Sequence, residues 1–148
     1  MSDRRQFCTF YLNGLFFGVE ARQVQEVLLH REMTRVPLAP PEIAGVLNLR
    51  GRIVTMFDMR SRLGLPPLQN GAVRMAVGVE FRGEAYGLLV DAMGEVMRLS
   101  QSSRDPNPAH LDPSWATVAA GVHPLEAKLM VVLDIDRLLE PPTHALAA

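Results

Sequence analysis

The chain has 148 residues, of which 48% are hydrophobic and 21% charged, and its formal net charge is −1. This length suits one domain of ordinary size or two very small units that share a core. A nearly neutral chain with 6% aromatic residues and no basic block has no general attraction for anionic lipid and argues against a nucleic-acid binder. Cys8 is the only cysteine, which excludes an intrachain disulfide and a zinc site built from cysteines.

The first residues are charged and no apolar segment of a signal peptide follows them. No apolar run approaches the roughly 18 residues of a membrane span. We therefore expect a cytoplasmic protein that does not insert directly into a membrane. Its positive charge is almost entirely arginine, because Lys128 is the only lysine. Arginine suits bidentate contacts with carboxylates at protein interfaces.

The beginning of the chain predicts a β-hairpin followed by a helical turn. Residues 7–19 form two apolar runs joined by Asn-Gly at 13–14, the strongest short signal for a two-residue hairpin turn. Val24, Val27 and Leu28 then fall at i, i+3 and i+4. This is the spacing of one face of a helix, so we expect a short helical turn there.

Residues 45–58 are the most informative stretch of the first half. Two apolar runs are joined by Arg50-Gly51, which predicts strand, turn and strand, with Gly51 supplying the positive φ of a tight turn. Asp58 then predicts the N-cap of a short helix that Gly64 and two following prolines end. Packing does not require a guanidinium at the tip of a hairpin, so Arg50 is a candidate for binding.

The same stretch returns later in the chain. A shift of 76 positions places residues 45–63 on 121–139 without a gap and matches glycine, apolar and aspartate positions. Asp58 meets Asp134 in this alignment, so both are expected to cap helices.

A second block, residues 14–27, repeats at 83–96 with a shift of 69, also without a gap. The change of shift falls at 100–113, a segment rich in serine, proline and asparagine that predicts a loop. We infer an internal duplication with halves at about 7–65 and 73–140. Two sets of short strands with tight turns suggest two small barrels that pack against each other.

No pattern in the sequence argues for catalysis or for a cofactor. The four histidines are scattered and none has a histidine at i+4 or a cysteine nearby, so we expect no metal site. Helix capping explains Asp58 and Asp134 better than a catalytic carboxylate pair does. No glycine-rich phosphate loop is present. By elimination, we expect a binding module and not an enzyme.

Four motifs of the first half are distinctive as a set: Phe17-Gly18-Val19, Val24-Gln25-Glu26-Val27, Arg35-Val36-Pro37 and Gly45-Val46-Leu47-Asn48-Leu49-Arg50-Gly51. Together with matching segments at 87–91 and 133–139, they resemble the CheW family of bacterial chemotaxis coupling proteins. The resemblance covers about residues 7–140. Thr55 departs from the family pattern, which usually has proline there.

The resemblance implies an all-β fold with short helices, in which two pseudo-repeated five-stranded SH3-like barrels enclose a shared hydrophobic core. The whole chain, 1–148, would be a single CheW-like domain. It also implies a function without catalysis. The family joins the cytoplasmic tip of a chemoreceptor to the regulatory domain of the histidine kinase CheA, at receptor arrays on the membrane.

Carried over by motif, Val24, Glu26, Val27, Gly45 and Arg50 would lie on or beside the receptor-facing surface. Core packing is the alternative for the two valines. For Arg50 and Glu26 the alternative is a solvated surface pair that contributes ~0–1 kcal/mol to stability. A scaffold of a non-flagellar pathway (twitching pili, gene expression or a second messenger) remains open. So does an array member that binds the kinase but no receptor.

Overall fold

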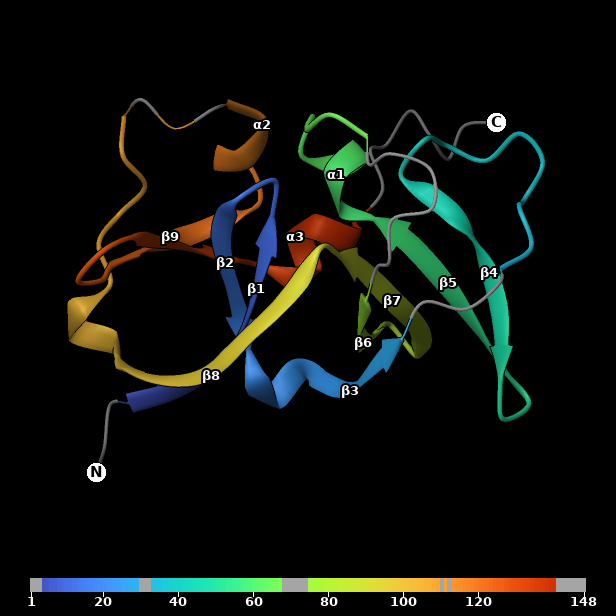
Figure 1. Cartoon of the computed structure of the whole chain (residues 1–148), viewed down its shortest axis with the longest axis horizontal. Coiled ribbons are helices and arrows are strands. Elements are labelled where there is room, and N and C mark those ends of the chain that lie inside the picture. The colour runs from blue at the N-terminus through green and yellow to red at the C-terminus, as the bar shows by residue number, and fades with distance from the viewer. Residues whose placement is uncertain (1–3, 30–32, 68–74, 110, 112, 141–148) are drawn as a thin grey trace.

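The computed structural model describes residues 4–29, 33–67, 75–109, 111 and 113–140. The chain forms two five-stranded sheets with a few short helices, as predicted (Figure 1). Sheet A has the order β8 (Ala92–Ser100), β1 (Arg4–Leu12), β2 (Leu15–Glu20), β10 (Leu129–Leu133) and β9 (Ala119–Pro124). Sheet B has the order β3 (Val24–Leu29), β6 (Met75–Phe81), β7 (Glu84–Val90), β5 (Arg52–Asp58) and β4 (Ile43–Leu49).

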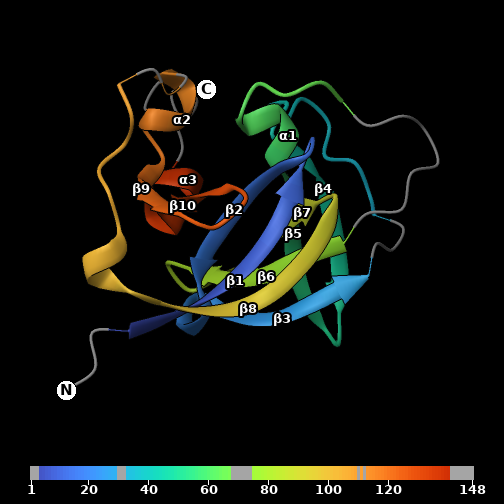
Figure 2. The ribbon, with the colours of Figure 1, turned by 60° about the vertical axis from the view of Figure 1, so that its left-hand side comes forward.

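Each sheet takes strands from both halves of the sequence. Sheet A combines the first hairpin of the first half, β1 and β2, with the last three strands of the second half. Sheet B is built the opposite way, from β6 and β7 of the second half and β3, β4 and β5 of the first. The halves at 7–65 and 73–140 therefore exchange their first hairpins, and neither half forms a sheet by itself. Figure 2 shows β8, β1 and β2 as curved strands in the foreground, with β4 and β5 behind them.

The register of the strands follows the internal repeat inferred from the sequence. In each sheet the exchanged hairpin joins its neighbour through a parallel pair. Val54 of β5 faces Ala85 of β7 in one sheet, and Met130 of β10 faces Phe16 of β2 in the other. These two pairs are related by the same shifts of 76 and 69 that align the sequence. The repeat therefore extends to the pairing of individual residues.

The two predicted helix caps occupy equivalent positions. The Asp58 carboxylate accepts a hydrogen bond from the backbone N of Ser61 at the start of α1 (Met59–Arg62), and Asp134 accepts one from Arg137 N in α3 (Ile135–Leu139). The N–O distances are 3.2 Å and 3.3 Å. An aspartate at the N-cap satisfies a backbone N–H that the helix itself leaves unpaired.

The helical turn predicted at residues 24–28 is wrong, since these residues belong to strand β3. A 3₁₀ turn, η1 (Ala21–Gln23), comes just before it. Val24 and Val27 lie opposite Val79 and Val77 of β6, with an irregularity in register between them. That irregularity places two residues at i and i+3 on one face of a strand, which imitates the spacing of a helix. The segment predicted as a loop also holds a 3₁₀ turn, η2 (Gln101–Ser103), before helix α2 (Pro113–Ala116).

A shared core joins the two sheets, as predicted. Its main cluster combines Phe10 and Phe17 of sheet A with Val77 and Leu88 of sheet B, all of them fully buried. Helix α3 lies between the sheets and adds its apolar side chains to this cluster (Figure 1). Two smaller clusters of buried side chains each belong to the strands of one sheet. One is Leu47, Val54, Met56, Ala76, Ala85 and Leu89, and the other is Phe7, Phe16, Met130 and Val132.

One buried ion pair, which sequence reasoning missed, connects the two halves. Arg60 of α1 donates through Nε and Nη2 to the two carboxylate oxygens of Asp91, at 2.9 Å and 2.6 Å. The backbone N of Asn13 donates to the same carboxylate, so the pair also holds the turn of the first hairpin. The hydrogen bond to Asp91 raises the pKa of Arg60 above its usual value. A two-point contact of this kind is stronger than a pair of neutral hydrogen bonds.

Candidate functional site

The tip of the β4–β5 hairpin presents Arg50 to solvent. Arg50 and Gly51 have φ values of 52° and 83°, the left-handed pair that a two-residue turn between twisted strands requires. The side chain of Asn48 accepts a hydrogen bond from Gly51 N at 2.9 Å, which fixes the turn. The Arg50 side chain keeps 74% of its surface exposed.

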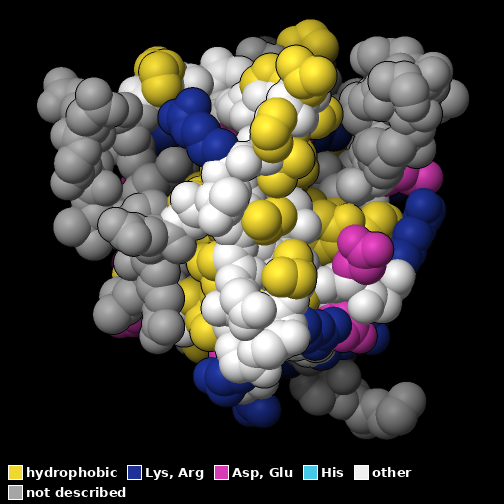
Figure 3. All heavy atoms as spheres, turned by 90° about the vertical axis from the view of Figure 1, so that its right-hand side faces the viewer, with side chains coloured by type: hydrophobic (Ala, Val, Ile, Leu, Met, Phe, Trp, Pro, Cys, Tyr) yellow, Lys and Arg dark blue, Asp and Glu magenta, His cyan; other side chains and the backbone are white. Residues whose placement is uncertain are grey.

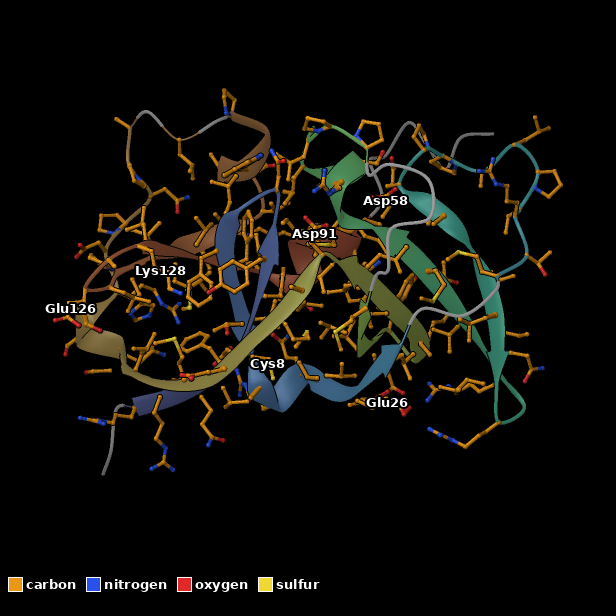
Figure 4. All side chains as sticks on the ribbon, viewed as in Figure 1. Cys8, Glu26, Asp58, Asp91, Glu126 and Lys128 are labelled. Atoms are coloured by element: carbon orange, nitrogen blue, oxygen red, sulfur yellow. The ribbon has the colours of Figure 1, made fainter. Side chains whose placement is uncertain are left out.

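The tip is tied to strand β3 by an ion pair. Arg50 Nη2 lies 2.7 Å from both carboxylate oxygens of Glu26. One nitrogen serves both carboxylate oxygens, so the contact is not the two-nitrogen fork that arginine can form with a carboxylate. Figure 4 shows Glu26 directed from β3 towards the hairpin tip. The Glu26 side chain is 34% exposed, so both charges remain hydrated in the free protein.

A second ion pair, missed at the sequence level, lies beside the first. Arg52 Nη2 donates to Glu80 Oε2 of β6 at 2.7 Å. A hydrogen bond from Arg52, and a smaller contribution from one with Gln25, lower the pKa of Glu80 below its ordinary value. Arg52 and Glu80 are 28 residues apart in the chain. Nothing local in the sequence could have paired them, because the contact depends on the exchange of hairpins between the halves.

Three members of these ion pairs, Glu26, Arg50 and Arg52, line a hollow of about 240 Å³, which we call the first groove. Its apolar lining comes from Leu28, Leu49, Val54, Val79, Ala85 and Tyr86. Burial raises the pKa of the Tyr86 hydroxyl above its ordinary value. An apolar floor with charged edges is the arrangement that accepts an amphipathic segment of a partner.

The other three predicted site residues, Val24, Val27 and Gly45, differ in how far they are buried. Val24 is half-buried and packs against the main core, whereas Val27 is 44% exposed. Gly45 is buried in β4, and a Cβ there would lie 2.7 Å from the carbonyl oxygen of Thr34. The structure thus brings Glu26 and Arg50 together at the first groove, and gives Gly45 a packing role behind it.

The side of the molecule that carries β4 also exposes apolar side chains. Figure 3 shows a vertical band of hydrophobic side chains on this side, with acidic and basic side chains close together next to its lower part. Exposed apolar residues of this region include Val36 at 41%, Leu38 at 104% and Ile53 at 58%. Leu38 has a φ of 62°, which is unusual for leucine.

Within the described ranges, no group of three or more histidine, cysteine, aspartate or glutamate residues could hold a metal ion. In the same part of the chain, no helix is long and apolar enough to cross a membrane.

Comparison with known proteins matches nearly the whole chain. The family model described as CheW-like domain covers residues 6–142. The chemotaxis protein CheW of Klebsiella aerogenes is 26% identical over 142 residues, which is 96% of this chain and 86% of that protein. The protein PilI of Pseudomonas aeruginosa is 31% identical over 116 residues, which is 77% of this chain and 62% of that protein.

A solved structure has the same fold. The crystal structure of the scaffolding protein TtCheW from Thermoanaerobacter tengcongensis superposes with a TM-score of 0.83 at 27% sequence identity, covering 93% of this chain and 88% of that one. The family match, the two related five-stranded sheets and the shared core lead to one conclusion: the chain belongs to the CheW-like domain family.

Proposed function

We propose that this protein is a non-catalytic adaptor that couples the cytoplasmic tip of chemoreceptors to the regulatory domain of the histidine kinase CheA. It would act in the cytoplasm, recruited to receptor arrays at the membrane. The observation that carries the proposal is the match to the CheW-like domain family over residues 6–142, together with an open, charge-bordered groove at the most distinctive motif.

The first groove suits a helix of the receptor. Its apolar floor would take side chains from one face of the helix, in the way that amphipathic helices bind to grooves. Arg50 uses only Nη2 for Glu26, and its remaining N–H groups can donate to the partner. Both charges lose water only in the complex, so the pair contributes more to binding than to folding.

The experiment is a three-component sedimentation assay with the full chain, a receptor cytoplasmic fragment and purified CheA. We expect the kinase to sediment with the receptor only when the chain is added, and its activity to become dependent on the receptor. If the chain binds neither component, the proposed function is wrong. Dialysis against ATP provides a second check, because an adaptor without a phosphate-binding site should not retain nucleotide.

Two alternative functions remain. The similarity to the protein PilI fits a scaffold of a non-flagellar chemosensory pathway. In that case the chain would bind the kinase and receptor of its own pathway and not those of flagellar chemotaxis. An array member that binds kinase alone would bind CheA in the assay while the receptor fragment stays free.

A further inference from the structure

The internal duplication gives the first groove a counterpart in the other sheet. A hollow of about 850 Å³ lies between β8 and the turn that joins β9 to β10, and we call it the second groove. Residues that line the first groove have repeat equivalents that line the second. The pairs are Glu26 and Glu95, Leu28 and Met97, Leu49 and Leu125, Arg50 and Glu126, and Arg52 and Lys128.

The second groove has a larger and more adaptable apolar lining. Phe16, Met93, Met97 and Leu125 contribute to it. Methionine side chains are flexible and polarisable, and they pack well against both aliphatic groups and aromatic rings. Such a lining can accept a large apolar side chain of a partner without a fixed shape.

The charges of the two grooves differ at one decisive position. In the first groove, Arg50 at the tip of the β4–β5 hairpin neutralises Glu26 on edge strand β3. In the second groove the equivalent tip residue is Glu126, so the groove is bordered by two carboxylates, Glu126 and Glu95. Within the described part of the chain, neither carboxylate takes part in an ion pair.

The lysine of the second groove is already engaged with aromatic rings. Lys128 Nζ donates to the Tyr11 hydroxyl at 2.6 Å and lies 4.0 Å from the centre of the Phe16 ring. Figure 4 shows Lys128 and Glu126 on the same side of the molecule, far from Glu26. A cation placed over a ring is attracted by the negative face of that ring, so Lys128 is held against the lining of the groove.

We propose that the second groove binds an amphipathic segment of a partner protein that places an arginine beside Glu95 and Glu126 and an apolar side chain against Met93 and Met97. The partner's arginine would stand where Arg50 stands in the first groove. Arginine suits this position better than lysine, because its planar group has five donors and can serve two carboxylates from different elements. The proposal does not depend on whether the first groove binds a receptor.

The test uses the full chain labelled at its methionine methyl groups and two synthetic helical peptides. Both peptides carry leucines along one face; one has a single arginine beside them, and the other has glutamate at that position. We expect the arginine peptide to shift the NMR signals of Met93 and Met97 to saturation. The signal of Met56, which packs under the first groove, should stay unchanged.

Two charge changes separate the groove from the rest of the surface. Glu126→Arg gives the second groove the residue type that Arg50 provides in the first, so that Glu95 gains a partner within the protein. Binding of the arginine peptide should therefore weaken by at least about tenfold. Glu84→Arg makes the same change of charge on β7, outside both grooves, and should leave affinity within about twofold. Thermal melting of both variants checks that the fold is intact.

Several results would overturn the proposal. Met93 and Met97 could remain unshifted at saturating peptide, or the glutamate peptide could bind as well as the arginine peptide. Glu84→Arg could weaken binding as much as Glu126→Arg does, which would mean a general charge effect. Sedimentation of the protein alone could show a dimer that Glu126→Arg dissociates, which would make a second copy of the chain the occupant.

Discussion

The substitution Arg50→Ala should separate binding from folding. Arg50 is 74% exposed and Glu26 is 34% exposed, so their ion pair is a hydrated surface pair that contributes about 0–1 kcal/mol to stability. For a chain of this size, 1 kcal/mol corresponds to about 2–4 °C in Tm. The Tm of the variant should therefore stay within about 4 °C of the wild-type value.

The effect on receptor binding should be much larger. Truncating one member of a charged pair that is desolvated in a complex costs about 2–5 kcal/mol. We expect the lower end, about 2–3 kcal/mol, because Glu26 remains partly accessible to water after the truncation. This loss corresponds to about a 30- to 150-fold weaker affinity.

Arg82→Ala is the matched control. Arg82 also occupies the first position of a two-residue turn, with a φ of 52° and Gly83 after it, and it pairs with Glu140 at 3.3 Å. Its side chain is 67% exposed, close to the value for Arg50. Titration of a receptor fragment should show weaker binding for Arg50→Ala and unchanged binding for Arg82→Ala. Equal effects of both substitutions, or unfolding of Arg50→Ala, would refute the assignment of Arg50 to the binding surface.

Three further predictions concern stability. Asp91→Asn removes the carboxylate that pairs with the buried Arg60 guanidinium and should lower the free energy of unfolding by about 3 kcal/mol in urea denaturation; a loss below about 1 kcal/mol would contradict the role given to this pair. Gly45→Ala should cost about 1–3 kcal/mol, because the new methyl group meets the Thr34 carbonyl, and an unchanged denaturation midpoint would show that β4 yields. Burial lowers the pKa of His123, so this residue contributes stability that is present above its unfolded pKa of about 6.5 and is lost as the pH falls through the lower pKa of the folded protein. His123→Leu should flatten the dependence of stability on pH below about pH 6.5, and an unaltered dependence would exclude His123 as its source.

Several features could be predicted from the sequence because they depend on interactions between near neighbours in the chain. The two predicted turns, at 13–14 and 50–51, each carry a glycine that accepts positive φ without strain, and both glycines adopt it. The caps at Asp58 and Asp134 use a hydrogen bond that spans three residues. Because these interactions involve near neighbours in the chain, the sequence around them is sufficient to predict them. The duplication was readable for the same reason, since it repeats these local signals.

The candidate site could be predicted from the sequence only in part. Arg50 stood out because a hairpin tip does not need a guanidinium, and the family resemblance pointed to Glu26. Arg52, Glu80 and the second groove carry no local signal. They were missed because each depends on residues from strands far apart in the sequence.

The sequence by itself determined the turns, the caps, the apolar strands and the repeat. Only the tertiary structure decided that the two halves exchange their first hairpins and that residues 24–29 form a strand paired with β6. Strand pairing is set by contacts between distant segments, and these override the helical spacing of a short apolar run. The assembled fold places Glu26 beside Arg50 and brings Glu95 and Glu126 to the lining of one groove, so the charge of each groove is a property of the tertiary structure.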